Sequence, residues 1–148
     1  MYESTIQNKI YSILGKNCEF IGTFARDEIP IIKKRPCSFI INTDLKNQKG
    51  EHWVGLYIGE NNEAFYFDSF GLPPYHKEIS DYINNNSNQV RFSTVTLQTP
   101  SQFSVTCGHY CIIFIIFMSK GHSFDDLIAL FTRNTFLNDM IVRKVLSM

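Results

Sequence analysis

An uninterrupted apolar segment at residues 111–118 constrains the fold of this 148-residue chain more than any other feature. Its eight residues fall far short of the about 20 that a membrane-spanning helix needs, so we expect a buried core element. The length from Cys107 to Lys120 and the following Gly121 favour a helix over a strand. Because such a helix is apolar on every side, other elements must cover it. The sequence therefore predicts a buried central helix that begins at Cys107.

The rest of the chain predicts an α+β fold, with a small antiparallel sheet flanked by helices. A helix is expected over residues 3–14, where Ser4 would cap the first turn and Gly15 would end the last. Three β-rich runs joined by polar turns predict an antiparallel meander, and a further alternating run predicts a fourth strand. These runs lie at residues 37–43, 52–59, 64–68 and 89–97. Further helices are expected at residues 76–83, at 124–131 with Ser123 as cap, and from Asn134 or Thr135 to Val145.

Charge and cysteine content narrow the class of protein. Fourteen Lys and Arg residues balance fourteen Asp and Glu residues, so no basic surplus points to nucleic acid or to an anionic membrane. The N-terminus lacks the basic and apolar regions of a secretory signal, which predicts an intracellular protein with reduced thiols. No linker rich in Pro, Ser or Gly divides the chain, so we expect a single domain over residues 1–148.

Cys107 is the first candidate for chemistry because it stands at the N-terminus of the predicted central helix. Backbone N–H groups and the helix dipole favour a thiolate there, which would lower the thiol pKa and create a nucleophile. Gly108, the next residue, would let another backbone or a substrate approach closely. The alternative is that Cys107 only fills the core, since many free cysteines are buried and inert.

His52 opens one strand of the predicted meander, and Asp68, sixteen residues later, ends the neighbouring strand. A hairpin of this length would bring the two side chains together. His52 could then act as the base for a thiol, while Asp68 accepts its Nδ1–H and fixes the tautomer. Taken singly, His52 could equally be an ordinary imidazole and Asp68 a turn-forming residue.

A zinc site is the other interpretation of the segment that carries Cys107. Cys107 and Cys111 would share one helix face. Structural zinc sites need a second ligand pair at matching spacing, and the sequence offers none. We therefore expect no bound metal. No glycine-rich phosphate loop follows a predicted strand either.

Taken in order, four segments resemble the adenovirus maturation protease (adenain) family of cysteine proteases. They are His52-Trp53, residues 67–71 (Phe-Asp-Ser-Phe-Gly), a glutamine, and residues 107–111 (Cys-Gly-His-Tyr-Cys). Residues 20–24 also resemble a Phe-Leu-Gly-Thr-Tyr segment of that family, so the resemblance covers roughly residues 17–118. The order of His, Asp, Gln and Cys resembles, more distantly, the deconjugases of SUMO and ubiquitin-like proteins.

The resemblance implies a Cys-His-Asp triad. Cys107 would be the nucleophile, His52 the general base, and Asp68, where adenain has Glu, the residue that orients His52. Trp53 would pack beside the imidazole and limit its contact with water, and Gly108 would support the site. The backbone N–H of Cys107 and the side chain of a glutamine would stabilise the oxyanion of the tetrahedral intermediate.

Two glutamines are candidates for the oxyanion donor. Gln98 and Gln102 both precede Cys107, and neither lies at the spacing found in the relatives. We favour Gln98 because it closes a predicted strand and because Gln98-Thr99-Pro100 resembles the Gln-Gly-Pro of adenain. A loop also absorbs extra residues more readily than it loses them. Gln102 stays open as the alternative.

The function implied by the resemblance is that of a viral or virus-derived cysteine endopeptidase, encoded by a virus, a virophage or a large DNA transposon. It would mature capsid precursors by cleaving after small residues, with a Gly-Gly or Gly-Xaa preference. One alternative is an isopeptidase that removes a ubiquitin-like modifier. Another is a protease-fold binding protein without activity, against which the complete set of His52, Asp68, Gln and Cys107 argues.

The same resemblance frames the expected partners. The substrate would be a polypeptide, the protein a monomer without membrane attachment, and its location the site of viral assembly in the host cell or the virion itself. Adenain is activated by a disulfide-linked peptide, but none of Cys18, Cys37 and Cys111 matches the cysteine that holds this peptide. We therefore expect no cofactor. A peptide activator stays possible but is not supported by a matching cysteine, and zero net charge argues against a requirement for nucleic acid.

Overall fold

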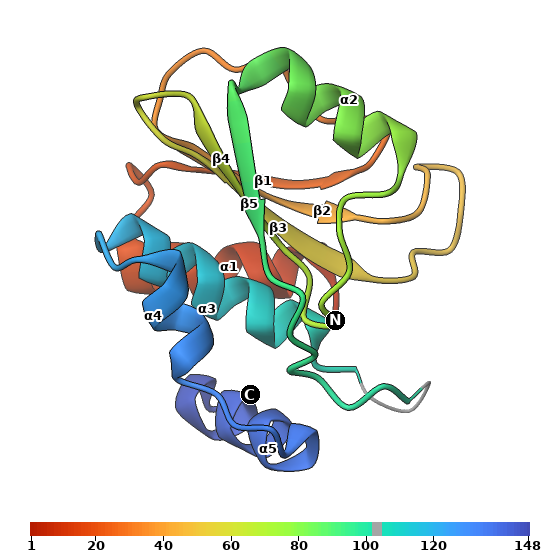
Figure 1. The fold of residues 1–148 in the computed structure, drawn as a ribbon, viewed down its shortest axis with the longest axis vertical. Helices are drawn as coiled ribbons and strands as arrows, with labels where there is room; N and C mark the ends of the chain where they lie inside the picture. Colours follow the sequence, from red (N-terminus) through yellow and green to blue (C-terminus); the bar gives the residue numbers. More distant parts are fainter. Residues whose placement is uncertain (102–104) are drawn as a thin grey trace.

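A five-stranded mixed sheet with strand order β1-β2-β3-β4-β5 forms the centre of the computed structural model, which describes residues 1–101 and 105–148 (Figure 1). Its strands are β1 (Phe20–Ala25), β2 (Cys37–Asn42), β3 (Trp53–Ile58), β4 (Glu63–Phe67) and β5 (Gln89–Phe92). The helices are α1 (Glu3–Leu14), α2 (Lys77–Asn86), α3 (Cys107–Ser119), α4 (Phe124–Ala129) and α5 (Thr135–Leu146). The predicted α+β class and the central helix that begins at Cys107 are confirmed.

The sheet is antiparallel only in its middle. β2, β3 and β4 form the predicted meander, in which Ile40 pairs with Gly55 and Gly55 with Phe67. Both edge strands instead run parallel to their neighbours, β1 beside β2 and β5 beside β4. The prediction of a purely antiparallel sheet was therefore wrong at both edges, and it lacked β1 altogether.

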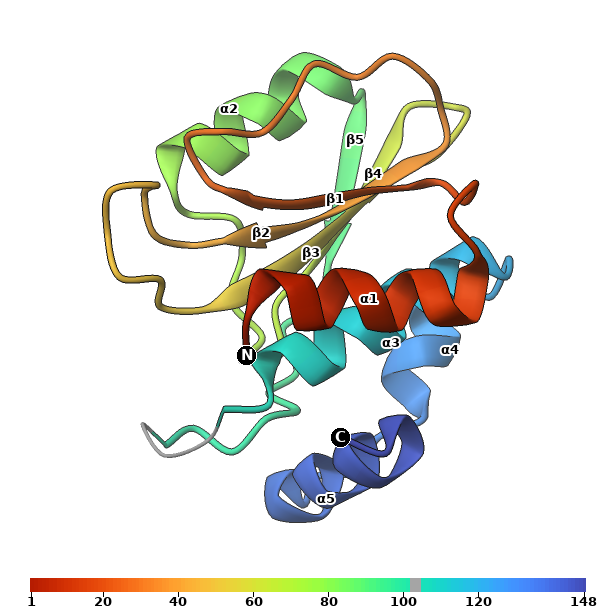
Figure 2. The ribbon, with the colours of Figure 1, turned by 180° about the vertical axis from the view of Figure 1, so that it is seen from behind.

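Helices cover both faces of the sheet (Figures 1 and 2). α2 lies on one face, where its residues Ile79 and Ile83 join a core layer with β2, β3 and β4. α1 and α3 lie on the opposite face, and α4 and α5 follow beyond α3. The alternation of side chains along each strand supplies both layers, as Ile40 faces α3 while Phe39 and Ile41 face α2.

α3 is apolar around its whole circumference because other elements surround it. It contacts α1, β3, α4 and α5, and eight of its thirteen residues are buried. Gly55 of β3 makes the close approach of α3 to the sheet possible, since a Cβ there would lie 2.4 Å from the Phe114 ring. The helix that begins with Cys107 is thus fixed against the strand that follows His52.

The helix ends agree with the sequence in most places. Gly15 ends α1, and Ser123 and Asn134 cap α4 and α5 by accepting backbone N–H groups. The predicted cap Ser4 was wrong, because α1 begins at Glu3 and Tyr2 precedes it without a side-chain cap.

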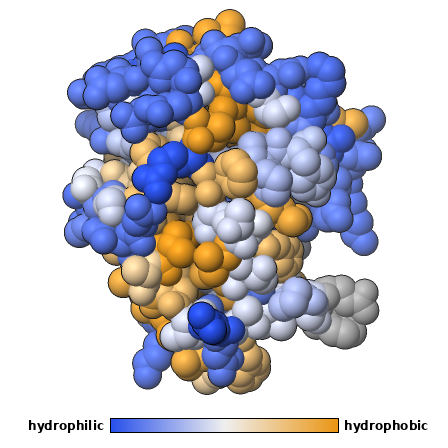
Figure 3. Space-filling view, viewed as in Figure 1, coloured by the Kyte–Doolittle hydropathy of each residue, from blue (hydrophilic) through white to orange (hydrophobic). Residues whose placement is uncertain are grey.

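The surface of one face is divided by polarity. Figure 3 shows hydrophilic residues over the upper part, where α2 lies, and hydrophobic residues gathered below it. On α5, the side chains of Phe136, Met140 and Val145 are exposed. Within residues 1–101 and 105–148, no helix is long and apolar enough to cross a membrane.

Candidate active site

The pairing of β3 with β4 brings His52 and Asp68 together. His52 directly precedes β3 and Asp68 directly follows β4, so in an antiparallel pair both residues lie at the same end of the sheet. The first residue of α3, Cys107, faces the same place because α3 packs along β3. Three residues that are distant in the sequence therefore meet at one edge.

His52 and Asp68 form the most clearly defined contact of the site. His52 Nε2 lies 2.9 Å from Asp68 Oδ1, and both side chains are largely buried. The expected partner of Asp68 was Nδ1, which was wrong: Asp68 holds Nε2. Nδ1 is therefore the ring nitrogen left for Cys107, whose side chain hydrogen bonds to His52.

The surroundings of Cys107 favour its thiolate. Burial is the largest single influence and raises the pKa of the thiol, whereas hydrogen bonding to His52 and the charge of the imidazole lower it. Hydrogen bonds from the backbone N–H groups of Trp53 and Gly108 lower the pKa further, so the net shift is downward. Cys111, one turn along the helix, shows the opposite shift, because burial and the charges of Cys107 and Asp68 all raise the pKa of its thiol well above the ordinary value.

The imidazole of His52 shows the complementary shift. Burial lowers its pKa, but hydrogen bonds to Asp68 and Cys107, with the charges of both, raise the pKa to about 9. At neutral pH, His52 is therefore an imidazolium next to a Cys107 thiol that is biased toward the thiolate. This ion pair is the arrangement that activates a cysteine as a nucleophile.

An aromatic ring covers the imidazole, and it belongs to Phe70. The rings of His52 and Phe70 stack with centroids 4.7 Å apart and an interplanar angle of 22°. The Trp53 side chain is buried in the core, and its indole N–H donates to the carbonyl of Met1 at 3.2 Å. Sequence reasoning assigned the covering role to Trp53 and missed Phe70, although Phe70 lies within the Phe-Asp-Ser-Phe-Gly segment that carried the resemblance.

Gln98 lies at the same edge, on the chain that leads into α3. Its side chain is 1% exposed, and its Oε1 accepts a hydrogen bond from Ser69 Oγ at 2.6 Å. The expectation that Gln98 closes a strand was wrong, because β5 ends at Phe92. The alternative donor Gln102 lies outside the described residues.

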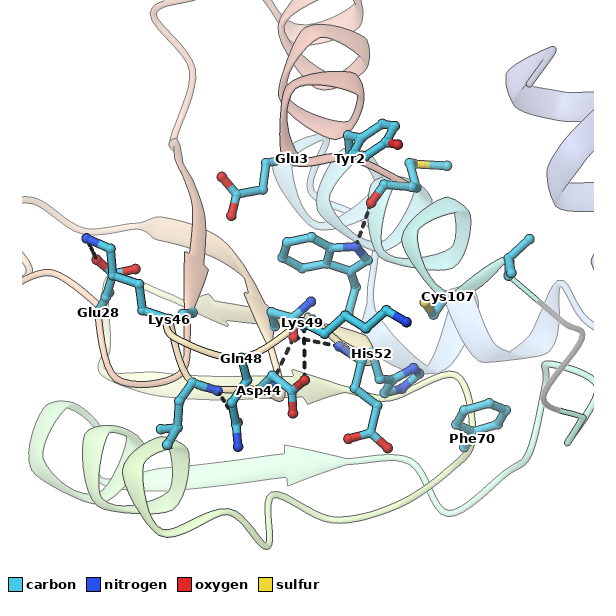
Figure 4. Close-up of a pocket in the computed structure, with 18 of the residues that line it drawn as sticks. Tyr2, Glu3, Glu28, Asp44, Lys46, Gln48, Lys49, His52, Phe70 and Cys107 are labelled. Carbon is cyan, nitrogen blue, oxygen red and sulfur yellow. Dashed lines mark hydrogen bonds and ion pairs between the residues drawn. The ribbon is translucent and has the colours of Figure 1, made fainter.

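A groove of about 1360 Å³ connects these residues (Figure 4). Cys107, His52, Phe70 and Gln98 line it, together with the first residues of the chain and the loop that precedes β3. Figure 4 shows Cys107 on the first turn of α3 with the His52 ring nearby. Charged side chains also line the groove, among them Glu3, Glu28, Asp44, Lys46 and Lys49.

Gly108 has a packing role. A Cβ at this position would lie 3.0 Å from the Met1 sulfur and 3.4 Å from Ile6, so the glycine lets the start of α1 approach the first turn of α3.

No cluster of three or more His, Cys, Asp or Glu side chains that could hold a metal occurs in the part of the chain that the structure describes.

The chain is similar to two viral proteins. It is 31% identical to the protease of bovine adenovirus 2 over 117 residues, which are 69% of this chain and 56% of that protein. It is also 29% identical to a protein of Acanthamoeba polyphaga mimivirus that is provisionally named thiol protease R355. This match extends over 98 residues, which are 61% of this chain and 32% of that protein. The chain thus spans just over half the length of the adenovirus protein and about a third of the length of the mimivirus protein. No protein-family model matches it.

Two solved structures share the fold. The ASFV pS273R protease matches with a TM-score of 0.52 at 20% identity, over 92% of this chain and 51% of that one. The central domain of Lpg1148 from Legionella pneumophila matches with a TM-score of 0.53 at 12% identity, over 99% of this chain and 97% of that one.

Both sequence relatives are named as proteases, one of them as a thiol protease, and the fold is shared with a further protease. In sequence, the chain resembles the protease of an adenovirus. The predicted family resemblance is confirmed at this level.

Proposed function

We propose that this protein is a cysteine endopeptidase in which Cys107, His52 and Asp68 act as a catalytic triad. The observation that carries the proposal is the 2.9 Å contact of His52 Nε2 with Asp68 Oδ1, with Cys107 close enough to the imidazole to raise its pKa. When the imidazole already holds the proton of the thiol, the thiolate can attack a carbonyl carbon without a separate step that deprotonates the thiol. The protease relatives support the same reaction class.

The proposed reaction proceeds in two halves. The Cys107 thiolate attacks the carbonyl carbon of the scissile peptide, a C–S bond forms, and the carbonyl π electrons move to the oxygen. As this intermediate collapses, the C–N bond breaks and His52 gives its proton to the departing amine. His52 then takes a proton from water, whose oxygen attacks the thioester. The C–S bond breaks, the carboxylic acid leaves, and the thiolate–imidazolium pair is restored.

Gln98 is the oxyanion donor in this proposal, together with the backbone N–H of Cys107. Its burial and its place in the groove beside Cys107 support the assignment. Loss of one oxyanion donor costs about 10²–10³ in rate. Gln98→Ala should therefore lower kcat by that factor, and Gln102→Ala should not. The reverse result would assign the role to Gln102.

The substrate in this proposal is a viral capsid precursor, cut after small residues in Gly-Gly or Gly-Xaa sequences. Its support is the resemblance to adenain and the adenovirus relative. The test is incubation of the protein with candidate capsid precursors and, separately, with ubiquitin-like conjugates, with cleavage sites mapped by mass spectrometry. Cys107→Ala serves as the inactive control.

Each outcome of this experiment decides between functions. Cleavage of the precursors at glycine sites, lost in Cys107→Ala, supports the proposal. Release of the modifier alone would make the protein a deconjugating isopeptidase. No cleavage of either substrate, with Cys107 unreactive, would leave a protease-fold binding protein and contradict the proposal.

A further inference from the structure

Ser69 links the two halves of the proposed catalytic machinery. It directly follows Asp68, is fully buried, and donates its hydroxyl to Gln98 Oε1 at 2.6 Å. The bond joins residues that lie 29 positions apart in the sequence. Neither Ser69 nor this bond has a role in the reaction described above.

The length of the bond indicates which end of the Gln98 amide faces Ser69. O–H···O bonds have donor–acceptor distances near 2.7–2.8 Å, whereas N–H···O bonds are longer, about 2.9–3.0 Å. A contact of 2.6 Å therefore fits a hydroxyl that donates to Oε1 and not an amide –NH2 that donates to the hydroxyl. With Oε1 facing Ser69, the –NH2 group is turned away from it.

Backbone bonds fix the two segments against each other. The carbonyl of Ser69 accepts the N–H of Leu97 at 2.8 Å and the N–H of Gln98 at 3.0 Å. The carbonyl of Leu97 in turn accepts from the Tyr110 hydroxyl at 3.2 Å and from Asn138 Nδ2 at 3.1 Å. The Ser69 hydroxyl therefore meets Gln98 from a fixed position.

We propose that Ser69 is a positioning residue that sets the orientation of the Gln98 amide, so that an N–H rather than Oε1 is presented to the oxyanion. This inference rests on the proposed function. A rotated amide would direct the lone pairs of Oε1 at the developing negative charge, which would destabilise the tetrahedral intermediate instead of stabilising it. Ser69 acts through Gln98 and touches no reacting atom.

Two small reagents test this role without knowledge of the substrate. Iodoacetamide alkylates a thiolate directly, with loss of iodide, and generates no oxyanion. p-Nitrophenyl acetate acetylates the thiolate through a tetrahedral oxyanion, with loss of p-nitrophenolate, and water then releases acetate. The ratio of the acetylation rate to the alkylation rate at Cys107, measured by peptide mass spectrometry, therefore reports oxyanion stabilisation alone.

Ser69→Ala should lower this ratio about tenfold, the effect of one misplaced hydrogen bond, through the acetylation rate. In the Gln98→Ala background, Ser69→Ala should change the ratio by less than about twofold, because no amide is left to orient. Ser69→Cys, of similar size but with a weak donor, should act in the same direction and carries the test if Ser69→Ala unfolds.

Thr96→Val is the matched control. The Thr96 hydroxyl donates to the carbonyl of Phe70 at 3.0 Å, so it holds the same turn without touching Gln98. This exposed residue should change the ratio by no more than about twofold. An unchanged ratio in Ser69→Ala, or an equal loss with and without Gln98, would overturn the inference. A wild-type Cys107 that is no more reactive than Cys18 would instead overturn the proposed function.

Discussion

Asp68 Oδ1 lies 2.9 Å from His52 Nε2 and also accepts the backbone N–H of Phe70 at 2.8 Å. One oxygen atom of a buried carboxylate thus joins the imidazole to the turn that follows β4. Because the turn holds the carboxylate, the position of His52 depends on local backbone structure and not only on a flexible side-chain contact. The same turn supplies the Phe70 ring that covers the imidazole.

Asp68→Asn should lower the pKa of His52. The variant keeps the shape of the contact but removes a negative charge, whose loss is expected to lower the pKa by about 1–3 units from its value of about 9. Titration of the His52 ring protons by NMR measures the change. An unchanged pKa would show that Asp68 does not support the imidazolium.

The same substitution should alter stability in a pH-dependent way. Since the folded-state pKa of His52 is raised above 6.5, its contribution to stability is complete below pH 6.5 and disappears as pH rises through about 9. At pH 6, Asp68→Asn should therefore have a clearly lower free energy of unfolding than the wild type. At pH 10 the difference between the two should be smaller. Urea unfolding at both pH values measures it. Equal losses at both values would contradict this linkage.

Phe70→Ala should weaken the imidazolium without moving Asp68. Alanine keeps the backbone N–H that donates to Asp68 but removes the ring stacked on His52. A cation–π contact contributes about 0.5–1 kcal/mol at a partly exposed site, so the pKa of His52 should fall by roughly half a unit. A rise in the pKa would indicate that the ring only desolvates the imidazole. Phe92→Ala, an exposed ring on β5 outside the site, is the control.

Asp139 of α5 should stabilise the start of α3 through Thr106 and Tyr110. Its carboxylate accepts from the hydroxyls of Thr106, at 3.1 Å, and Tyr110, at 2.7 Å. Asp139→Ala removes a shared acceptor from these two buried hydroxyl donors and should cost about 1–3 kcal/mol, measured by thermal or urea unfolding. Asp125→Ala is the matched control, because Asp125 only pairs with Arg91 on the surface and should cost less than about 1 kcal/mol. Equal costs would contradict the role of Asp139.

Gly55→Ala should separate α3 from the sheet. The new Cβ would lie 2.4 Å from the buried Phe114 ring, and such overpacking typically costs about 1–3 kcal/mol. Because the shift moves Cys107 relative to His52, the alkylation rate of Cys107 should also fall. Gly59→Ala, whose Cβ meets its nearest atom at 3.8 Å, should change the unfolding free energy much less. A stable Gly55→Ala variant with a normal rate would show that α3 adjusts freely.

The elements that the sequence predicts well are those with an unbroken pattern. The apolar run of α3 and the polar turns between β2, β3 and β4 define these elements locally. β1 was missed because a register shift between Phe20 and Gly22 interrupts the alternation that marks a strand. The predicted end of the last strand was wrong because the N–H groups of Leu97 and Gln98 bond to Ser69 and not to a neighbouring strand.

The site was only partly predictable for a similar reason. The residue types and their order indicate Cys107, His52 and Asp68, since a hairpin brings its two ends together. The rotation of the His52 ring decides which of its two nitrogen atoms contacts Asp68. No sequence pattern predicts this rotation. The roles of Phe70 and Ser69 arise from one turn whose side chains reach His52 and Gln98 across the fold.

The central claim is that His52 holds Cys107 as a reactive thiolate. The most direct measurement is the pH dependence of Cys107 alkylation by iodoacetamide, in wild type and in His52→Ala. We expect a wild-type midpoint below the ordinary thiol pKa of 9.0. In His52→Ala, the midpoint should rise above the wild-type value, since burial then acts without the imidazolium. A midpoint at or above 9.0 in the wild type, unchanged by His52→Ala, would show that His52 does not hold Cys107 as a thiolate.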